Sequence, residues 1–331
     1  MPFYLDGIGE KRIIYIIGVD NMIIRDLAKR SKTLKSLYQI IRNEIYSTAT
    51  KISPTLNTKM RYKSVFGKKW DPNNVITLND KILWLKLNTY NDNMLVKQCA
   101  DKYRVREYIK EIGCEELLNN LLAVCENPDA IEWKTLPSKF VIKLNVGCGC
   151  NIVVTDKNQL DISDTRKQLR KWMKEKYYLL YSEMQYKDVK PYILIERYLQ
   201  PKKGTLPEDY KFYCMNGRAE YVMVCIGREN GGHPKFYFYD RKWNFCPFEE
   251  KEDPNLEKPL LIDKAFEYAD KLSTPFPFVR TDLYLYDNNI VFGELTFTSA
   301  GGLDVGVSEE GMRIMGDMVD LNYPNKSIKL G

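Results

Sequence analysis

The sequence predicts an α+β fold with a helical N-terminal region, a small domain built from a hairpin and a helix, and a larger antiparallel C-terminal domain. Three observations predict it. Residues 1–95 have a mostly helical composition, the apolar pattern changes to an alternation of two from Phe140 onward, and hairpin patterns follow. At 331 residues, the chain is long enough for two or three subdomains around one cleft.

The composition is that of an ordinary globular protein, with 44% hydrophobic and 28% charged residues. Because the 50 Lys and Arg residues are interleaved with 44 acidic ones, we expect a mixed surface and no nucleic-acid partner. The eight cysteines form no regular framework, which predicts free thiols in a reducing cytoplasm. The longest apolar run, residues 13–19, is too short to cross a bilayer, and no signal-peptide pattern precedes it.

The chain has a single histidine, His233, which argues against His-rich metal sites and His-based nucleophilic triads. Cys148 and Cys150 stand one residue apart, which is neither a CxxC redox pair nor half of a usual zinc site. Acid–base or phosphate chemistry must therefore come from carboxylates, lysines and arginines.

The first 95 residues carry no functional signal. They are rich in Lys, Asn, Leu and Ile and are predicted to be mostly helical, although residues 13–19 could form a short strand. The next helix is predicted over residues 100–112. Gly113 should end it, because glycine favours the left-handed conformation just beyond a helix C-terminus.

A hairpin–helix unit is predicted next. Residues 140–145 and 151–156 are rich in β-forming residues and flank the flexible sequence Val146-Gly147-Cys148-Gly149-Cys150. An amphipathic helix over about 163–184 follows, and residues 192–199 form another strand. The apolar face of the helix comprises Leu169, Trp172, Met173, Tyr177 and Leu180.

The loop that contains Gly147 and Gly149 is a candidate phosphate site. Glycines let backbone N–H groups approach a phosphate closely, and Lys143 on the entering strand could supply positive charge. An ordinary glycine-rich hairpin turn would look the same. The loop matches neither the Walker A pattern nor GxGxxG, which disfavours those nucleotide folds.

In the C-terminal region, Asn216-Gly217 joins residues 209–215 to 220–227 and is the strongest two-residue turn signal available. Asp209, Lys211 and Tyr213 then share one face of their strand. This arrangement either directs an acid and a base to the same cleft or forms an ordinary charge ladder.

The last hairpin, with strands 278–286 and 290–297, is the most informative segment. If its three-residue loop is centred on Asn288, Asp282 faces Glu294, Arg280 faces Thr296, and all four share one face. Two opposed carboxylates repel each other, so we expect a cation between them, and the Asp282→Asn substitution should leave the fold intact. Oxygen-only ligation suits Mg²⁺ or Mn²⁺, with Arg280 beside it to contact phosphate. The alternative is a surface hairpin with solvated charges, which the apolar residues on both strands disfavour.

Six segments carry a resemblance to a known family. They are LNDKILWLKL (78–87), ADKYRVREYIKEIG (100–113), LPSKFVIKLNVGCG (136–149), ILIERYL (193–199), EDYKFYCMNG (208–217) and FVRTDLYLYDNNIVFGELTF (278–297). In this order they resemble the ATP-grasp superfamily and, more closely, its TupA-like branch, which is associated with teichuronopeptide and surface-polysaccharide biosynthesis. The resemblance implies an ATP-grasp fold with a helical region (1–95), a pre-grasp segment (96–136), a small lid domain (137–200) and a C-terminal domain (201–331).

The resemblance also implies site residues. Lys102 and Lys143 would bind the ATP phosphates, and a loop of Gly147, Cys148 and Gly149 would close over them. Glu196 and the backbone of Arg197, Tyr198 and Leu199 would form the adenine hinge. Asp209 would bind the ribose hydroxyls. Lys211 would point at phosphate or at the acceptor. Asp282 and Glu294 would bind Mg²⁺, and Arg280 would stabilise the transferred phosphoryl group.

Two positions depart from the family pattern. Val146 and Gly147-Cys148-Gly149 stand where the branch usually has His and Gly-Ser-Gly, so the phosphate contacts of the loop are left to backbone groups. Thr296 stands where the superfamily often has an Asn metal ligand, which weakens a second metal position.

The resemblance implies an ATP-dependent ligase that joins small-molecule or sugar-linked carboxylates and amines through an acylphosphate. Catalysis would come from positioning and charge neutralisation. Three alternatives stay open: a sugar or small-molecule kinase on the same fold, a nucleotide-binding protein without catalysis, and a glycosyltransferase role for which no motif is found. The sequence identifies neither the acceptor nor the oligomeric state.

Overall fold

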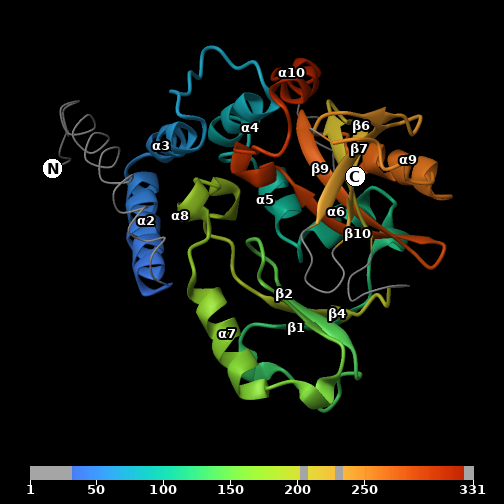
Figure 1. The fold of residues 1–331 in the computed structure, drawn as a ribbon. Coiled ribbons are helices and arrows are strands. Elements are labelled where there is room, and N and C mark those ends of the chain that lie inside the picture. The colour runs from blue at the N-terminus through green and yellow to red at the C-terminus, as the bar shows by residue number, and fades with distance from the viewer. Residues whose placement is uncertain (1–31, 202–207, 228–233, 250, 324–331) are drawn as a thin grey trace. The chain divides into compact units, whose positions relative to one another are not determined.

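The computed structural model describes residues 32–201, 208–227, 234–249 and 251–323 (Figure 1). The chain divides into two compact units. One comprises Met1–Trp70 with Leu179–Ser182, and the other comprises Asp71–Tyr178 with Glu183–Gly331. Within the described ranges, no helix is long and apolar enough to cross a membrane. The segment 13–19 and His233 lie outside these ranges.

Among the described residues, α2 (Lys32–Ile52) and α3 (Pro54–Phe66) are the main helices of the N-terminal unit. Ser53 separates them because its side chain accepts the Leu56 N–H at the start of α3, where Pro54 cannot donate. The two helices pack through a small core of Tyr46, Ala49, Leu56 and Met60. The helical prediction is therefore confirmed for this part of the chain.

The second unit contains most of the remaining helices. They are α4 (Leu78–Leu87), α5 (Met94–Ala100), α6 (Val105–Glu111), α7 (Ile162–Lys174), α9 (Ile262–Ser273) and α10 (Glu309–Asp317), whereas the short α8 (Tyr178–Tyr181) belongs, except for Tyr178, to the N-terminal unit. Together with two antiparallel sheets, they confirm the α+β prediction.

The predicted helix over residues 100–112 is wrong at its start. α5 ends at Ala100, Asp101 is extended, and α6 begins only at Val105. The Asp101 side chain accepts the N–H groups of Tyr103 and Arg104, while the Lys102 N–H donates to the carbonyl of Asn145 at 3.0 Å. This long-range hydrogen bond replaces a helical one and fixes Lys102 beside the first hairpin.

The predicted helix over 163–184 also breaks, because α7 ends at Lys174. Leu169, Trp172 and Met173 pack in the core of the smaller sheet. By contrast, the carbonyl group of Leu179 accepts hydrogen bonds from Thr50 and Asn57 in the N-terminal unit. The backbone of Glu175 is extended, with φ −72° and ψ 125°, so the helix stops there.

The smaller sheet has the order β1-β4-β2-β3, with every neighbouring pair antiparallel. Its strands are β1 (Leu121–Cys125), β2 (Phe140–Leu144), β3 (Asn151–Val154) and β4 (Ile193–Arg197). The predicted hairpin around the glycine loop is confirmed as β2 and β3, whereas β1 was not predicted. Phe140, Ile142 and Leu144 are buried against α7, so the intervening Lys143 lies on the other face.

The larger sheet has the order β10-β9-β5-β6-β7-β8 and is also antiparallel. Its strands are β5 (Asp209–Met215), β6 (Arg218–Ile226), β7 (Lys235–Asp240), β8 (Phe245–Cys246), β9 (Phe278–Tyr286) and β10 (Asn289–Thr296). The predicted Asn216-Gly217 turn is confirmed, with positive φ at both residues as a type I′ turn requires.

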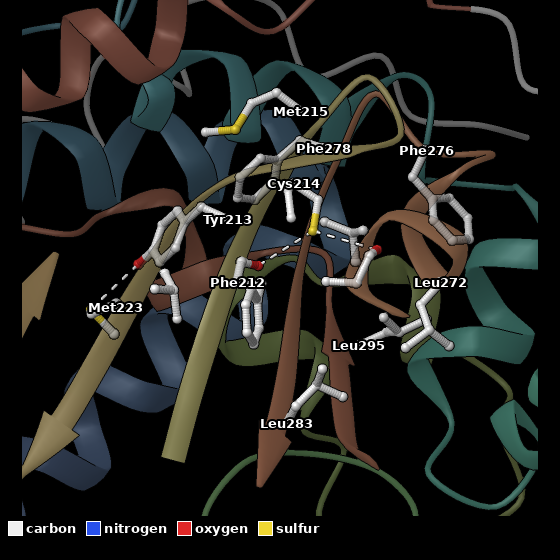
Figure 2. Close-up of a cluster of buried hydrophobic side chains, with 14 of the residues drawn as sticks. Phe212, Tyr213, Cys214, Met215, Met223, Leu272, Phe276, Phe278, Leu283 and Leu295 are labelled. Atoms are coloured by element: carbon white, nitrogen blue, oxygen red, sulfur yellow. Dashed lines mark hydrogen bonds between the residues drawn. The ribbon is translucent and has the colours of Figure 1, made fainter. Parts of the chain in front are cut away.

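The core of the larger sheet decides which way its polar residues point. Helix α9 packs on β5, β6 and β9 (Figure 1), where the Phe212 ring meets Phe266 edge-on at 4.8 Å and Cys214 Sγ lies 3.8 Å from the Ala269 carbonyl. Figure 2 shows Phe212 and Cys214 among the buried side chains of this cluster. Because side chains alternate along a strand, Lys211 points to the opposite face.

Candidate functional site

The hairpin of β9 and β10 has the predicted pairs, Asp282 opposite Glu294 and Arg280 opposite Thr296. Its turn differs from the prediction, since it holds two residues rather than three. These are Asp287 and Asn288, with φ values of 49° and 57°. A two-residue turn alone would shift the pairing by one residue and turn Glu294 to the other face of the sheet.

A β-bulge between Phe292 and Glu294 restores the pairing. Gly293 is the extra residue, and a Cβ there would lie 2.9 Å from the carbonyl oxygen of Asp282. The bulge therefore requires glycine. An isolated glycine within a strand pattern was the sequence signal for it.

The cation expected between the two carboxylates is Arg280 itself. Its Nε and Nη2 donate to the two oxygens of Asp282 at 2.7 and 2.8 Å, and Nη2 lies 3.4 Å from Glu294 Oε1. Nη1 donates to Ser299 Oγ at 2.9 Å. The guanidinium thus contacts both acids, and its charge offsets their repulsion.

Lys211, opposite Asp282 on the neighbouring strand β5, adds a second cation. Its Nζ lies 2.5 Å from Asp282 Oδ2 and 2.6 Å from Asp209 Oδ2. Burial lowers the pKa of Lys211, but Asp282 and Asp209 outweigh it and raise this pKa above its usual value. The prediction that Asp209 and Lys211 share a face is confirmed. Since Asp209 is only 3% exposed, a ribose hydroxyl would have to compete with this ion pair.

Lys102 connects the glycine loop with the last hairpin. Its Nζ donates to the Gly147 carbonyl at 2.8 Å and lies 3.5 Å from Glu294 Oε2. Burial raises the pKa of Glu294, but Lys102, Arg280 and Lys211 outweigh it and lower this pKa to about 2. Glu294 is therefore ionised at neutral pH.

The glycine loop lies against Tyr177, which the sequence did not identify as a site residue. Gly147 has a φ of 81°, and a Cβ there would lie 3.2 Å from the ring of Tyr177. The ring of Tyr177 meets that of Tyr186 edge-on at 5.8 Å. Nothing in the local pattern distinguishes Tyr186, which lies in the short 3₁₀ turn Met184–Tyr186. Cys148, between the glycines, is exposed.

If the glycine loop closes over ATP, as the resemblance implies, Gly147→Ala should raise the KM for ATP by about tenfold or more and Gly149→Ala only a few-fold. Both glycines have left-handed φ, which costs an L-residue about 1–2 kcal/mol. A Cβ at Gly149 meets nothing within 4 Å, whereas one at Gly147 would push against Tyr177. Steady-state kinetics of the two variants checks this difference. Equal KM values would exclude the tyrosine contact as a determinant of loop position.

Lys143 and Glu196 form an ion pair across β2 and β4, with Nζ 2.8 Å from Oε2. A nucleotide phosphate would therefore have to compete with this carboxylate for Lys143. The pair lies at the strand end where the adenine hinge is predicted, and Asn119 Nδ2 lies 3.5 Å from the same oxygen.

Some backbone hydrogen-bonding groups of the predicted hinge already have partners within the protein. The Arg197 N–H donates to the Asn120 carbonyl, and the Arg197 carbonyl accepts from Asn119 Nδ2, both at 2.9 Å. The carbonyl oxygen keeps a second lone pair for a ligand, but the N–H does not remain free. The N–H of Leu199 makes no hydrogen bond to a described residue, so it is a donor that adenine could use. The sequence did not indicate Asn119 or Asn120.

Asp282 and Glu294 could bind Mg²⁺ only if phosphate oxygens supplied further ligands. Both oxygens of Asp282 already accept hydrogen bonds from Arg280 and Lys211, whereas Glu294 is 35% exposed at its side chain and less tightly held. In the part of the chain that the structure describes, no group of three His, Cys, Asp or Glu side chains is arranged to bind a metal. Mg²⁺ commonly takes one or two carboxylates and completes its octahedron with waters and phosphate oxygens. The donor set therefore fits a metal that arrives with a nucleotide.

Comparisons with known proteins identify the family. A family model described as TupA-like ATPgrasp matches residues 80–320. A search of curated proteins finds no match. Similar solved structures include D-alanine–D-alanine ligase from Bacillus anthracis complexed with ATP, with 15% identity, a TM-score of 0.37, and coverage of 60% of this chain and 55% of that chain.

Two further structures are similar at the same level. The ATP-grasp ligase PsnB complexed with a minimal precursor has 12% identity, a TM-score of 0.37, and coverage of 74% of this chain and 64% of that chain. Phosphoribosylamine–glycine ligase from Thermotoga maritima has 17% identity, a TM-score of 0.34, and coverage of 60% and 48%. This chain thus spans about half to two thirds of the length of these structures. Since the family model covers most of its residues, the chain belongs to the TupA-like ATP-grasp family.

Proposed function

We propose that this protein is an ATP-dependent ligase that joins a carboxylate to an amine through an acylphosphate, and that it acts in bacterial surface-polysaccharide biosynthesis. Family membership supports the use of ATP. The observation that carries the proposal is the position of Lys102, whose Nζ contacts both the Gly147 carbonyl and Glu294. A phosphate chain bound there would lie between the glycine loop and the acidic hairpin.

The reaction has two steps. A carboxylate oxygen of the first substrate bonds to the γ-phosphorus while the bond to the bridging oxygen breaks and ADP leaves. The amine nitrogen of the second substrate then attacks the acyl carbon and loses a proton, and inorganic phosphate leaves. Arg280 donates to the oxygens on which negative charge develops, and its contacts with Asp282 and Ser299 keep it oriented.

Charge balance explains why this site would need a metal. Three acids, Asp209, Asp282 and Glu294, are paired with three cations, Lys102, Lys211 and Arg280. The cluster therefore has no spare positive charge for a triphosphate. Mg²⁺ held by Glu294 and Asp282 would supply that charge and polarise the phosphoryl oxygens. The protein residues bind and orient the reactants.

We therefore expect neither free ATP nor Mg²⁺ alone to raise the melting temperature, and the two together to raise it clearly. Ligand linkage gives about 2.7 kcal/mol of stabilisation at a hundredfold excess over Kd. Thermal shift with ATP, with MgCl₂ and with both measures this, and Glu294→Gln should remove most of the joint effect. Full stabilisation by ATP in the presence of EDTA would contradict the charge-balance argument.

Product analysis tests the reaction class. The protein is incubated with Mg-ATP and pooled uronic acids and amino acids, and ADP and inorganic phosphate are assayed separately. A ligase releases both in equal amounts and needs the carboxylate and the amine together. ADP accompanied by a phosphorylated product, without free phosphate, would show a kinase and overturn the proposal.

A further inference from the structure

Charge is unevenly distributed along the chain. Residues 32–70 contain nine Lys and Arg residues and one acidic residue, Glu44. Residues 71–331 contain 36 basic and 39 acidic residues. The N-terminal unit is thus strongly cationic, while the part of the chain that carries the candidate site is slightly acidic.

Helix α2 has two apolar faces. One face, with Tyr46 and Ala49, packs against α3. The other consists of Leu37, Ile40, Ile41 and Ile52, which are 53, 58, 48 and 52% exposed. Helical spacing aligns these four side chains in one stripe, because residues three and four apart lie on the same side. We call this set the α2 stripe.

The same unit carries exposed lysines. Lys51 lies within the stripe, and Lys59, Lys63, Lys68 and Lys69 follow on or just after α3. None of these five lysines forms a described ion pair. Large aliphatic side chains and unpaired lysines together are typical of helices that lie in the interface of a membrane.

We infer that the N-terminal unit docks on an anionic membrane surface. Helix α2 would lie parallel to the bilayer with its stripe at the boundary between head groups and acyl chains, and the lysines would contact lipid phosphates. This binding uses residues remote from the candidate site in sequence and is independent of the ligase proposal.

Two other binding partners match the α2 stripe and the lysines less well. A second copy of the chain would bring two strongly cationic units together, and like charges oppose such an interface. A nucleic acid would neutralise the lysines, but it would leave four large aliphatic side chains in water. An anionic lipid surface satisfies both the apolar and the charged groups.

Flotation of the full chain with vesicles tests the inference. We expect binding to phosphatidylcholine vesicles that contain about 30% phosphatidylglycerol, at least about tenfold weaker binding to phosphatidylcholine alone, and release by salt. The triple variant Leu37→Ser, Ile40→Ser, Ile41→Ser and the triple variant Lys59→Glu, Lys63→Glu, Lys68→Glu should each reduce binding about tenfold or more. A matched control, Lys171→Glu, Lys174→Glu, Lys242→Glu, changes the same number of exposed lysines in the other unit and should bind as wild type.

Circular dichroism and the Mg-ATP thermal shift show whether each variant is folded. Equal binding to neutral and anionic vesicles, or no binding at all, would overturn the inference. So would tighter binding to a short DNA duplex than to vesicles, or a dimer by light scattering that the Ser variant converts to a monomer. Because vesicle binding and turnover are separate readouts, a failed ligase assay leaves this result unaffected.

Discussion

Replacing Asp282 with Asn should abolish ATP turnover and lower the melting temperature. Asp282 is 2% exposed and accepts hydrogen bonds from Arg280 and Lys211, so the neutral amide leaves two half-buried cations without a full counter-charge. Breaking a buried ion pair by removing one partner costs about 3–5 kcal/mol. The expectation from the sequence that Asp282→Asn leaves the fold intact is therefore reversed, because the cation that offsets the repulsion belongs to the protein.

Glu294→Gln is the matched control for stability. Glu294 faces Asp282 but is 35% exposed at its side chain, and its contacts with Arg280 and Lys102 are longer, at 3.4 and 3.5 Å. We expect it to lose turnover while melting clearly above Asp282→Asn. Differential scanning calorimetry without nucleotide compares the two variants. If Asp282→Asn melts as high as Glu294→Gln, the ion-pair account of Asp282 is wrong.

Replacing Arg280 with Lys should lower kcat by about 10²- to 10³-fold although the charge is kept. The guanidinium donates simultaneously to Asp282, Ser299 and Thr296, and an ammonium group cannot reproduce that fork. Loss of one oriented donor to a developing negative charge typically has an effect of this size. Pre-steady-state measurement of ADP formation separates this chemical step from product release.

Arg241→Lys serves as the control for a general Arg-to-Lys effect. Arg241, in the turn after β7, binds Asp270 of α9 through two hydrogen bonds at 2.8 and 3.0 Å, much as Arg280 binds Asp282. Its replacement should leave kcat unchanged. If the Arg280→Lys variant kept more than about a third of wild-type kcat, Arg280 would have no role in the phosphoryl-transfer step.

Features of the fold that depend on neighbouring residues were predictable. The Asn216-Gly217 turn joins β5 to β6 as expected, because both residues tolerate positive φ at low cost. Strands β2 and β3 follow the alternation of apolar residues, and Gly113 ends α6 with a φ of 69°. Strands β1, β7 and β8 were not predicted, because their short segments are not joined by a turn signal as clear as Asn216-Gly217.

The register of the last hairpin was predicted correctly for an incomplete reason. The turn at Asp287 and Asn288 is one residue shorter than expected, and the bulge at Gly293 compensates for it. Asp282 and Glu294 thus share a face through two deviations that cancel. A hairpin register inferred from the loop alone is therefore less secure than one that also accounts for glycines within the strands.

Ordered motifs, turn chemistry and strand alternation were enough to predict the family, the hairpins and the acidic pair. Three-dimensional folding was needed to show that the Lys102 N–H bonds with the Asn145 carbonyl outside any helix, and that the Lys102 amine reaches both Gly147 and Glu294. It was also needed to show that Arg280 and Lys211 already neutralise Asp282. These contacts join segments far apart in the chain, and local patterns contain no information about which distant partner will satisfy a charge or a backbone group.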